Sequence, residues 1–327
     1  MSGNADSLVF RELRRSDLPT FSKVIHLGIG NLERSTGLDE GAEAMFRTLE
    51  RRSVWLLLGF MRLLGRPIVR IWVASSGPRV VGTGTLILLP KAGYVAGMAT
   101  DPEFRGRGIA SRILALQQDA AASRGRTWVV LDVESENETA IRVYRKAGYR
   151  DAGRYAWYTR LGVPAPSPVP PGDGAPASKA ELKEYVEKLN ASRAADLQAA
   201  LPADTRMLSH NEFLVRTVGV KHRTWVRSYG GSTPSSVRAY RVPRTHLGVY
   251  FPVVGTPEPS ADELAALFAP ATEWLRPEAP QRTVAVVAEP AGAAGAALER
   301  MGLVRVVSST LMVKEIASGA GPGAPAR

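Results

Sequence analysis

Hydrophobic positions in the first half of the chain switch several times between a period of two, typical of strands, and a period near 3.6, typical of helices. Turn or cap signals separate these runs, as at Ser76-Gly77-Pro78. The expected elements are a strand at Leu8 to Leu13, a helix start at Ser16 to Pro19 with helical material through Arg51, a hairpin of Ile68 to Ser75 and Arg79 to Leu89, a strand at Tyr94 to Thr100, a helix ending at Arg124, a strand at Thr127 to Val133 and a helix at Glu138 to Lys146. This order predicts an α+β fold with a mixed sheet.

The most apolar run of the chain, Val54 to Leu64, is open to three interpretations. It could lie on a membrane, line a pocket for an acceptor, or form a buried helix. The run is too short to span a bilayer, and Gly59 and Arg62 interrupt it. We therefore expect a buried helix of the first domain.

The second half of the chain repeats the first. Arg70 to Gly77 matches Arg223 to Gly230 at a shift of 153 residues, and Arg126 to Val130 matches Arg282 to Val286 at a shift of 156. Two matches in the same order at nearly the same offset indicate a duplicated domain. Between the halves, a proline-rich stretch without periodicity predicts an extended linker. The expected boundaries are 1–160 for the first domain, 161–178 for the linker, 179–316 for the second domain and 317–327 for a disordered tail.

Composition narrows the chemistry that is available. The 327 residues, 45% of them apolar, suffice for two cores. The sequence contains no cysteine and only four histidines, which excludes thiolate chemistry and argues against a metal site. No run of 18 apolar residues and no signal-like start are present, so we expect a cytoplasmic protein without a membrane partner.

The positive charge is concentrated in the first half. Residues 1–160 contain 24 Lys and Arg against 16 Asp and Glu, a net charge of +8, and the rest of the chain contributes +3 of the total of +11. A polyphosphate cofactor, an acidic protein and nucleic acid would all suit this excess. The basic residues are interspersed with acids and form no dense tract, which argues against nucleic acid.

The strongest chemical signal is the loop Asp101-Pro102-Glu103-Phe104-Arg105-Gly106-Arg107-Gly108-Ile109-Ala110, between a strand and an amphipathic helix. A chain that turns through two glycines into a helix presents several unpaired amides to one point, and this arrangement suits an anion. Dinucleotide-binding folds use a related device, but the third glycine is missing here, and no Walker lysine follows. A solvated basic turn that only begins a helix is the alternative interpretation.

The combination of this loop with the segment downstream resembles the GNAT superfamily of N-acetyltransferases. Arg105-x-x-Gly108-x-Ala110 resembles its pyrophosphate motif, and Asn137, Ala140-Ile141, Tyr144 and Gly148-Tyr149 resemble its last strand-helix segment. The resemblance covers Val9 to about Arg160 and is greatest to the ribosomal-protein alanine acetyltransferase group. It implies a GNAT fold for the first half, acetyl-CoA as cosubstrate and transfer of its acetyl group to a primary amine. Together with the repeat, it predicts a tandem GNAT fold.

Residue roles follow from the same resemblance. Tyr144 would be the general acid toward the leaving sulfur, and Asp132, with Glu134 on the same face of its strand, would act as base through a water. Their other interpretations are a core aromatic and a solvated strand end, and Asn137 could be a plain N-cap. The implied cofactor-binding residues are Met98, Ala99, Thr100, Arg105, Gly106, Arg107, Gly108, Ile109, Ala110, Ser111 and Asn137.

The second half lacks the corresponding residues. When Gly302-Leu303 is matched to Gly148-Tyr149, Ala291 replaces Asn137 and Leu298 replaces Tyr144. A helix from Ala261 to Trp274 follows a proline-rich turn instead of a glycine loop. We expect a degenerate GNAT-like domain that serves packing, substrate shaping or pairing into a homodimer.

Two other function classes remain open on the sequence. A noncatalytic acyl-CoA-binding or regulatory protein would hold the cofactor without transfer, and an interaction module would use only its basic surface. The resemblance implies that variable loops, here Gly28 to Gly41 and the front of the second domain, select the acceptor, so a protein N-terminus, a lysine and a small amine all stay open.

Overall fold

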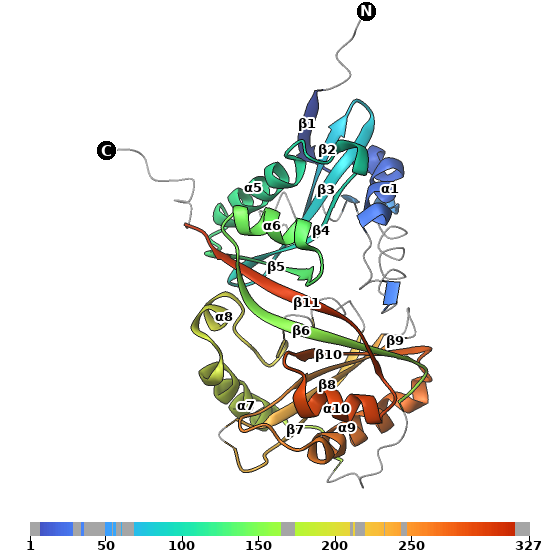
Figure 1. The fold of residues 1–327 in the computed structure, drawn as a ribbon, viewed down its shortest axis with the longest axis vertical. Coiled ribbons are helices and arrows are strands. Elements are labelled where there is room, and N and C mark those ends of the chain that lie inside the picture. Colours follow the sequence, from blue (N-terminus) through green and yellow to red (C-terminus); the bar gives the residue numbers. More distant parts are fainter. Residues whose placement is uncertain are drawn as a thin grey trace, which may run out of the picture. The chain divides into compact units, whose positions relative to one another are not determined.

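A computed structural model describes residues 7–28, 34–35, 50–53, 55–56, 60, 69–164, 174–209, 212, 220–231, 233–242 and 247–317. The chain forms two compact units (Figure 1). Unit 1 comprises Met1–Gly30, Asp39–Ala152 and Leu311–Arg327, and unit 2 comprises Asn31–Leu38 and Gly153–Thr310.

The sheet of unit 1 begins with antiparallel strands and ends with parallel pairing. Its first five strands are β1 (Leu8–Glu12), β2 (Val69–Ser76), β3 (Arg79–Leu88), β4 (Ala92–Thr100) and β5 (Trp128–Glu134). They lie in sequence order, and only the β4–β5 pair is parallel. The sheet is therefore mixed, as predicted.

Helices cover this sheet and follow the amphipathic pattern of the sequence. The helix α1 (Leu18–Gly28) packs Phe21, Val24 and Ile25 against Val73 and Val80. The helix α5 (Ile109–Ala122) connects β4 to β5, and its buried residues join a cluster with Val129, Leu131 and Val133 of β5. The helix α6 (Glu138–Lys146) follows β5 and has the predicted bounds.

The last strand of the chain completes the sheet of unit 1. β11 (Val304–Glu315) is the neighbour of β5, and its residues from Leu311 onward belong to unit 1 (Figure 1). Met312 is fully buried in the same core cluster as Tyr144 and Tyr149. The amide of Ile316 also donates to the Thr127 carbonyl at 2.8 Å. The core of the first half thus depends on residues near the C-terminal end of the second half.

Unit 2 repeats the strand arrangement of unit 1. Its strands β7 (Lys221–Arg227), β8 (Ser235–Val242), β9 (Leu247–Val253) and β10 (Arg282–Ala288) pair antiparallel, antiparallel and then parallel, as do β2 to β5. β6 (Arg150–Leu161) begins in unit 1, and its residues 155–161 pair with β10. The two matched sequence segments therefore occupy equivalent strands.

The helices of unit 2 also follow this repeat. The helix α9 (Ala261–Leu275) connects β9 to β10, and α10 (Gly292–Arg300) follows β10. On the N-terminal side lie α7 (Lys179–Ser192) and α8 (Ala195–Ala200). A core cluster packs Leu264 and Phe268 of α9 and Leu298 of α10 against Trp225 and Tyr250 of the sheet.

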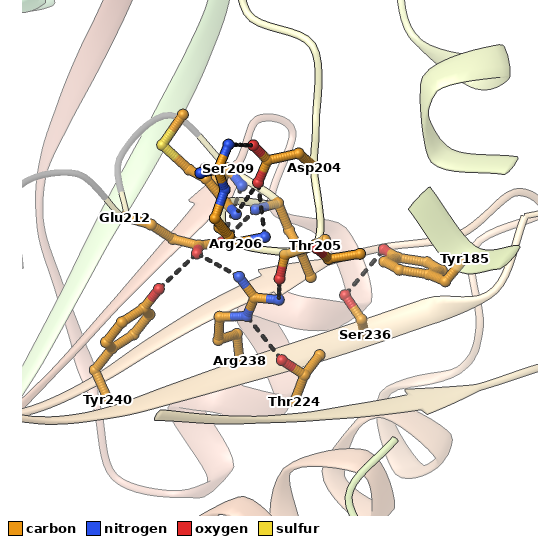
Figure 2. A network of polar contacts seen from close by, with 12 residues as sticks. Tyr185, Asp204, Thr205, Arg206, Ser209, Glu212, Thr224, Ser236, Arg238 and Tyr240 are labelled. Carbon is orange, nitrogen blue, oxygen red and sulfur yellow. Dashed lines mark hydrogen bonds and ion pairs between the residues drawn. The ribbon is translucent and has the colours of Figure 1, made fainter. Parts of the chain in front are cut away.

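A buried ion pair ties the segment after α8 to the sheet of unit 2 (Figure 2). The carboxylate of Glu212 lies 3.0 Å from the Arg238 guanidinium, and both side chains are fully buried. Tyr240 donates to the same carboxylate at 2.7 Å, and Arg238 also donates to Thr224 and to the Thr205 carbonyl. These bonds satisfy both charges, as burial in a low-dielectric interior requires.

The apolar run Val54 to Leu64 lies mostly outside the described residues. Of its described members, Trp55 packs against the α1 cluster, whereas Leu56 and Phe60 are 75% and 56% exposed. The expected burial is therefore wrong for these two side chains. Across the described ranges, no helix is long and apolar enough to cross a membrane.

Candidate active site

The sheet of unit 1 opens between β4 and β5. Their parallel ladder has four pairs, from Ala92–Trp128 to Val95–Leu131, and then stops. β4 nevertheless continues to Thr100 along β3, while β5 continues to Glu134. Because the strands diverge, the backbone groups of Met98, Ala99 and Thr100 that face β5 are not paired with it. This stretch of backbone can therefore bind an extended ligand.

The N-terminus of α5 lies directly after this opening. Its N-cap is Gly108, at φ 74° in the left-handed region, and no side chain caps the helix. The first bond across the helix start runs from the Arg112 amide to the Gly108 carbonyl at 3.0 Å. The amides of Ile109, Ala110 and Ser111 therefore have no acceptor within the helix and point out of its N-terminal end. Amides in this arrangement bind anions.

The two glycines of the loop combine a special conformation with open space. Gly106 has φ 76°, and a Cβ added at Gly106 or Gly108 would meet no atom within 4 Å. Both positions favour glycine because of their positive φ. The side chain of Ile109, in contrast, is buried in the core and fixes the start of the helix. A diphosphate can therefore approach this backbone without displacing protein atoms.

Arg79 holds this loop in place. Its guanidinium lies 2.5 Å from Asp101 and 3.0 Å from Glu103, and it stacks over Phe104 at 5.6 Å. Arg107 stacks over the same ring at 4.9 Å. Asp101 in turn accepts a hydrogen bond from the Glu103 amide. Arg79 was not among the predicted site residues, because its role depends on the β2–β3 hairpin bringing it beside the loop.

Asp132 is held by a tyrosine of the neighbouring strand. The Tyr94 hydroxyl donates to Asp132 Oδ2 at 2.7 Å, and Tyr94 is 3% exposed. Asp132 is the first β5 residue beyond the last ladder pair, so its carboxylate lies at the vertex of the opening. Glu134 ends the same strand on the same face. Tyr94 is a second residue that the sequence analysis missed, since the contact requires the β4–β5 register.

Asn137 caps the next helix. Its side-chain oxygen accepts from the Ala140 amide at 3.1 Å, so the N-cap interpretation is confirmed. Among the described residues, its side-chain nitrogen has no hydrogen-bond partner. The cap therefore leaves the two donor hydrogens of this amide available for a ligand.

Tyr144 lies in α6 with its ring in the core of unit 1. It is 8% exposed, and its ring centroid lies 6.0 Å from that of Tyr149. Burial raises the pKa of Tyr144 to about 12. Its hydroxyl has no hydrogen-bond partner in the part of the chain that the structure describes. The core interpretation holds for the ring, and the phenol remains protonated at neutral pH.

The structure supports the expected alignment of unit 2 with these positions. Tyr149 donates its amide to the Tyr144 carbonyl and Leu303 to the Leu298 carbonyl, both at 3.0 Å. Asn137 and Ala291 are the N-caps of α6 and α10, but Ala291 makes no side-chain cap. Leu298 thus fills the core position of Tyr144 without a hydroxyl.

Comparisons with known proteins now identify the family. The profile of the Acetyltransferase (GNAT) family matches residues 38–149. The chain is 33% identical over 111 residues to the N-alpha-acetyltransferase RimI of Mycobacterium tuberculosis, covering 33% of this chain and 68% of that protein. The chain belongs to the GNAT family of acetyltransferases, and its resemblance to the ribosomal-protein alanine acetyltransferase group is confirmed.

Other relatives show how far the similarity extends. The chain is 32% identical over 100 residues to the IAA acetyltransferase of Azospirillum brasilense, which covers 30% of this chain and 65% of that protein. A solved tandem GNAT protein from the clavulanic acid biosynthesis pathway aligns with 97% of this chain and 100% of its own, with a TM-score of 0.52 and 16% identity. At that identity the match shows the fold alone. The tandem GNAT fold predicted from the sequence is therefore confirmed.

Proposed function

We propose that this protein is an acetyl-CoA-dependent N-acetyltransferase whose unit 1 binds acetyl-CoA and transfers the acetyl group to a primary amine. The observation that carries the proposal is that an opening between two strands is followed directly by a helix N-terminus without a side-chain cap. The β4–β5 ladder ends at Val95–Leu131, and the uncapped start of α5 follows on the same chain segment. An extended pantetheine arm between diverging strands, with its diphosphate at a helix N-terminus, suits both features.

Each cofactor-binding residue has a physical role in this proposal. The backbone of Met98, Ala99 and Thr100 binds the pantetheine amides, and the Asn137 side-chain nitrogen donates to the same arm. The amides of the loop and first turn hold the diphosphate, aided by the Arg105 and Arg107 charges. These backbone and side-chain donors are Arg105, Gly106, Arg107, Gly108, Ile109, Ala110 and Ser111. Bound acetyl-CoA supplies the thioester that the amine attacks.

Asp132 moves a proton from the amine in this proposal, directly or through a water. An α-amino group has a pKa of about 7.7–8.0, so its deprotonation at neutral pH costs little. Deprotonation of a lysine with a pKa near 10.4 costs roughly 4–5 kcal/mol at neutral pH. Tyr94 orients the carboxylate at the vertex, and Glu134 adds a second negative charge that attracts a cationic acceptor. Protein N-termini are therefore easier acceptors for this site than lysines, although small amines of low pKa fit equally.

Tyr144 stabilises the leaving sulfur as a hydrogen-bond donor. Burial raises the pKa of Tyr144 to about 12, whereas a thiol has a pKa near 8.5. Complete proton transfer from phenol to thiolate is therefore uphill by roughly 4–5 kcal/mol, so donation of a hydrogen bond is the better description. This lowers the charge that develops on sulfur without requiring ionised Tyr144.

The test is a matched pair of substitutions at the start of α5. Ser111→Asp places a carboxylate where the diphosphate would lie, and a helix N-terminus stabilises an acidic side chain, so folding should persist. We expect Ser111→Asp to weaken acetyl-CoA binding at least tenfold in calorimetry, while Ser111→Ala retains it. Equal binding by both variants would contradict the proposed site.

A second function is favoured by one observation, the buried position that Tyr144 shares with Leu298 of unit 2. A core role alone suits a protein that binds acyl-CoA without transferring the acyl group. Release of CoA with a panel of amines separates the two functions. Turnover that falls in Tyr144→Phe supports the enzyme, whereas acetyl-CoA binding without turnover in any variant supports the noncatalytic protein.

A further inference from the structure

Unit 2 retains the strand opening of unit 1. The parallel ladder of β9 and β10 also has four pairs and ends at Tyr250–Ala285. β9 then continues to Val253 and β10 to Ala288. The fold therefore forms the same diverging strands twice, followed each time by a helix start.

The helix start in unit 2 is closed by its own side chains. Ser260 caps α9, and its hydroxyl accepts from the Glu263 amide at 3.3 Å. The Glu263 carboxylate accepts from the Ser260 amide and hydroxyl, both at 2.8 Å. This capping box occupies the backbone amides at the start of α9, whereas no side chain caps the start of α5 at Gly108. Asp262 and Glu263 also add negative charge to the first turn of α9.

A second carboxylate of the same loop reaches the other helix. Glu258 accepts a hydrogen bond of 2.6 Å from the amide of Ala293, in the first turn of α10. Gly292 has φ 44°, and a Cβ there would collide with the Glu258 carboxylate. Arg300 of α10 is also paired with Asp262 of α9. The loop thus joins the N-terminal ends of both helices that flank the opening.

Hydrogen bonds to the first residue of β8 and to the segment just before it fix the position of this loop. The Gly255 amide donates to the Ser235 hydroxyl at 2.8 Å, and Thr233 pairs with Thr256 as an isolated bridge. A Cβ at Gly255 would overlap the Thr233 carbonyl, so the two backbones approach closely. The position of the carboxylates is therefore fixed by the fold of unit 2.

We propose that the segment Glu258 to Glu263, termed the acidic latch, is a built-in anionic ligand of unit 2. Its carboxylates occupy the start of α9, where the phosphates of an acyl-CoA would otherwise bind, and the start of α10, the counterpart of the position that binds the pantetheine arm in unit 1. The latch excludes the cofactor by occupancy and by charge repulsion, and it fastens α9 to α10 across the opening. The full chain consequently binds one acetyl-CoA, in unit 1. This inference rests on the proposed function of unit 1.

Calorimetric titration of the full chain with acetyl-CoA tests the exclusion. We expect one molecule bound per wild-type chain and, in Ser111→Asp, no site other than this one, with its affinity lowered at least tenfold. Two molecules per chain, or a second site that survives in Ser111→Asp, would overturn the inference. No binding to the wild-type chain at all would instead contradict the proposed function of unit 1, so the two failures are distinguishable.

The fastening role has its own test by thermal unfolding. Glu258→Ala removes the acceptor for the Ala293 amide, whereas Glu258→Gln keeps an acceptor oxygen and serves as the matched control. Because loss of a cap costs about 1 kcal/mol, we expect Tm to fall by about 2–4 °C in Glu258→Ala and by less in Glu258→Gln. Faster amide exchange at the start of α10 should accompany the shift. An unchanged Tm together with unchanged exchange in Glu258→Ala would show that the latch fastens nothing.

Discussion

The hydroxyl of Tyr94 donates a 2.7 Å hydrogen bond to the carboxylate of Asp132 across the last ladder position of two diverging strands. A residue of β4 thereby fixes the side chain that we propose as base on β5. The same strands form the opening in which we propose that the cofactor binds, so this opening and the orientation of the carboxylate both depend on the β4–β5 register.

This pair predicts a specific kinetic pattern. Tyr94→Phe keeps the ring but removes the donor to a charged acceptor, so we expect kcat to fall about tenfold, or ~1.4 kcal/mol, with KM for acetyl-CoA unchanged. Steady-state kinetics of a double-mutant cycle measures the coupling. In an Asp132→Asn background, Tyr94→Phe should have little further effect, whereas additive losses would show that Tyr94 acts independently of Asp132.

We predict that Tyr144 ionises at a higher pH than an ordinary tyrosine. Its folded-state pKa of about 12 lies above the ordinary value near 10 because burial disfavours the phenolate. Its contribution to stability is therefore fully present below pH 10 and is lost as the pH rises through about 12. The difference between ultraviolet titrations of wild type and Tyr144→Phe should show one tyrosine ionising near pH 12. A difference curve centred near pH 10 would contradict burial of the hydroxyl end.

Met312 predicts that the end of the chain stabilises the first unit. It is fully buried among unit 1 residues, so Met312→Ala should cost about 2–5 kcal/mol of unfolding free energy. Hydrogen exchange should show the lost protection in β5 and α5. Leu303→Ala is the control, since Leu303 belongs to the core of unit 2. Protection lost by Met312→Ala only outside unit 1 would contradict the strand assignment.

The buried ion pair of unit 2 predicts unequal costs for its members. Glu212→Gln leaves the Arg238 guanidinium buried without its counter-charge and should destabilise the protein by about 3–5 kcal/mol. Tyr240→Phe removes one of several hydrogen bonds to Glu212 and should cost about 1–3 kcal/mol. Urea unfolding of the two variants measures both values. A smaller loss in Glu212→Gln than in Tyr240→Phe would contradict the importance of charge pairing.

Local patterns predicted much of the fold and located the candidate site. The bounds of α6 and the start of α9 agree with prediction, because cap residues and helical periodicity are short-range signals. Alternation predicted that Asp132 and Glu134 share one face of β5, and both are less buried than Leu131 and Val133, which lie in the core. The strand repeat between the halves was also visible in the sequence.

Long-range relationships could not be predicted in this way. Nothing local in Val304 to Glu315 indicates that its residues from Leu311 onward belong to unit 1, where β11 is the neighbour of β5. Tyr94 and Glu258 have the same limitation, since their partners depend on strand register and on the path of a loop. The exposure of Leu56 and Phe60 shows a further limit, because an apolar run alone does not specify what covers it.

Because the end of β11 belongs to unit 1, unit 1 can be completed only late in translation. About 160 residues separate Ala152 from Leu311, so the ribosome must translate all of unit 2 before the sheet of unit 1 receives its last strand. At roughly 5–20 residues per second, that interval lasts about 8–30 seconds. Throughout it, the free edge of β5 is available to other nascent chains, and chaperones that cover exposed strands would protect this protein at that stage.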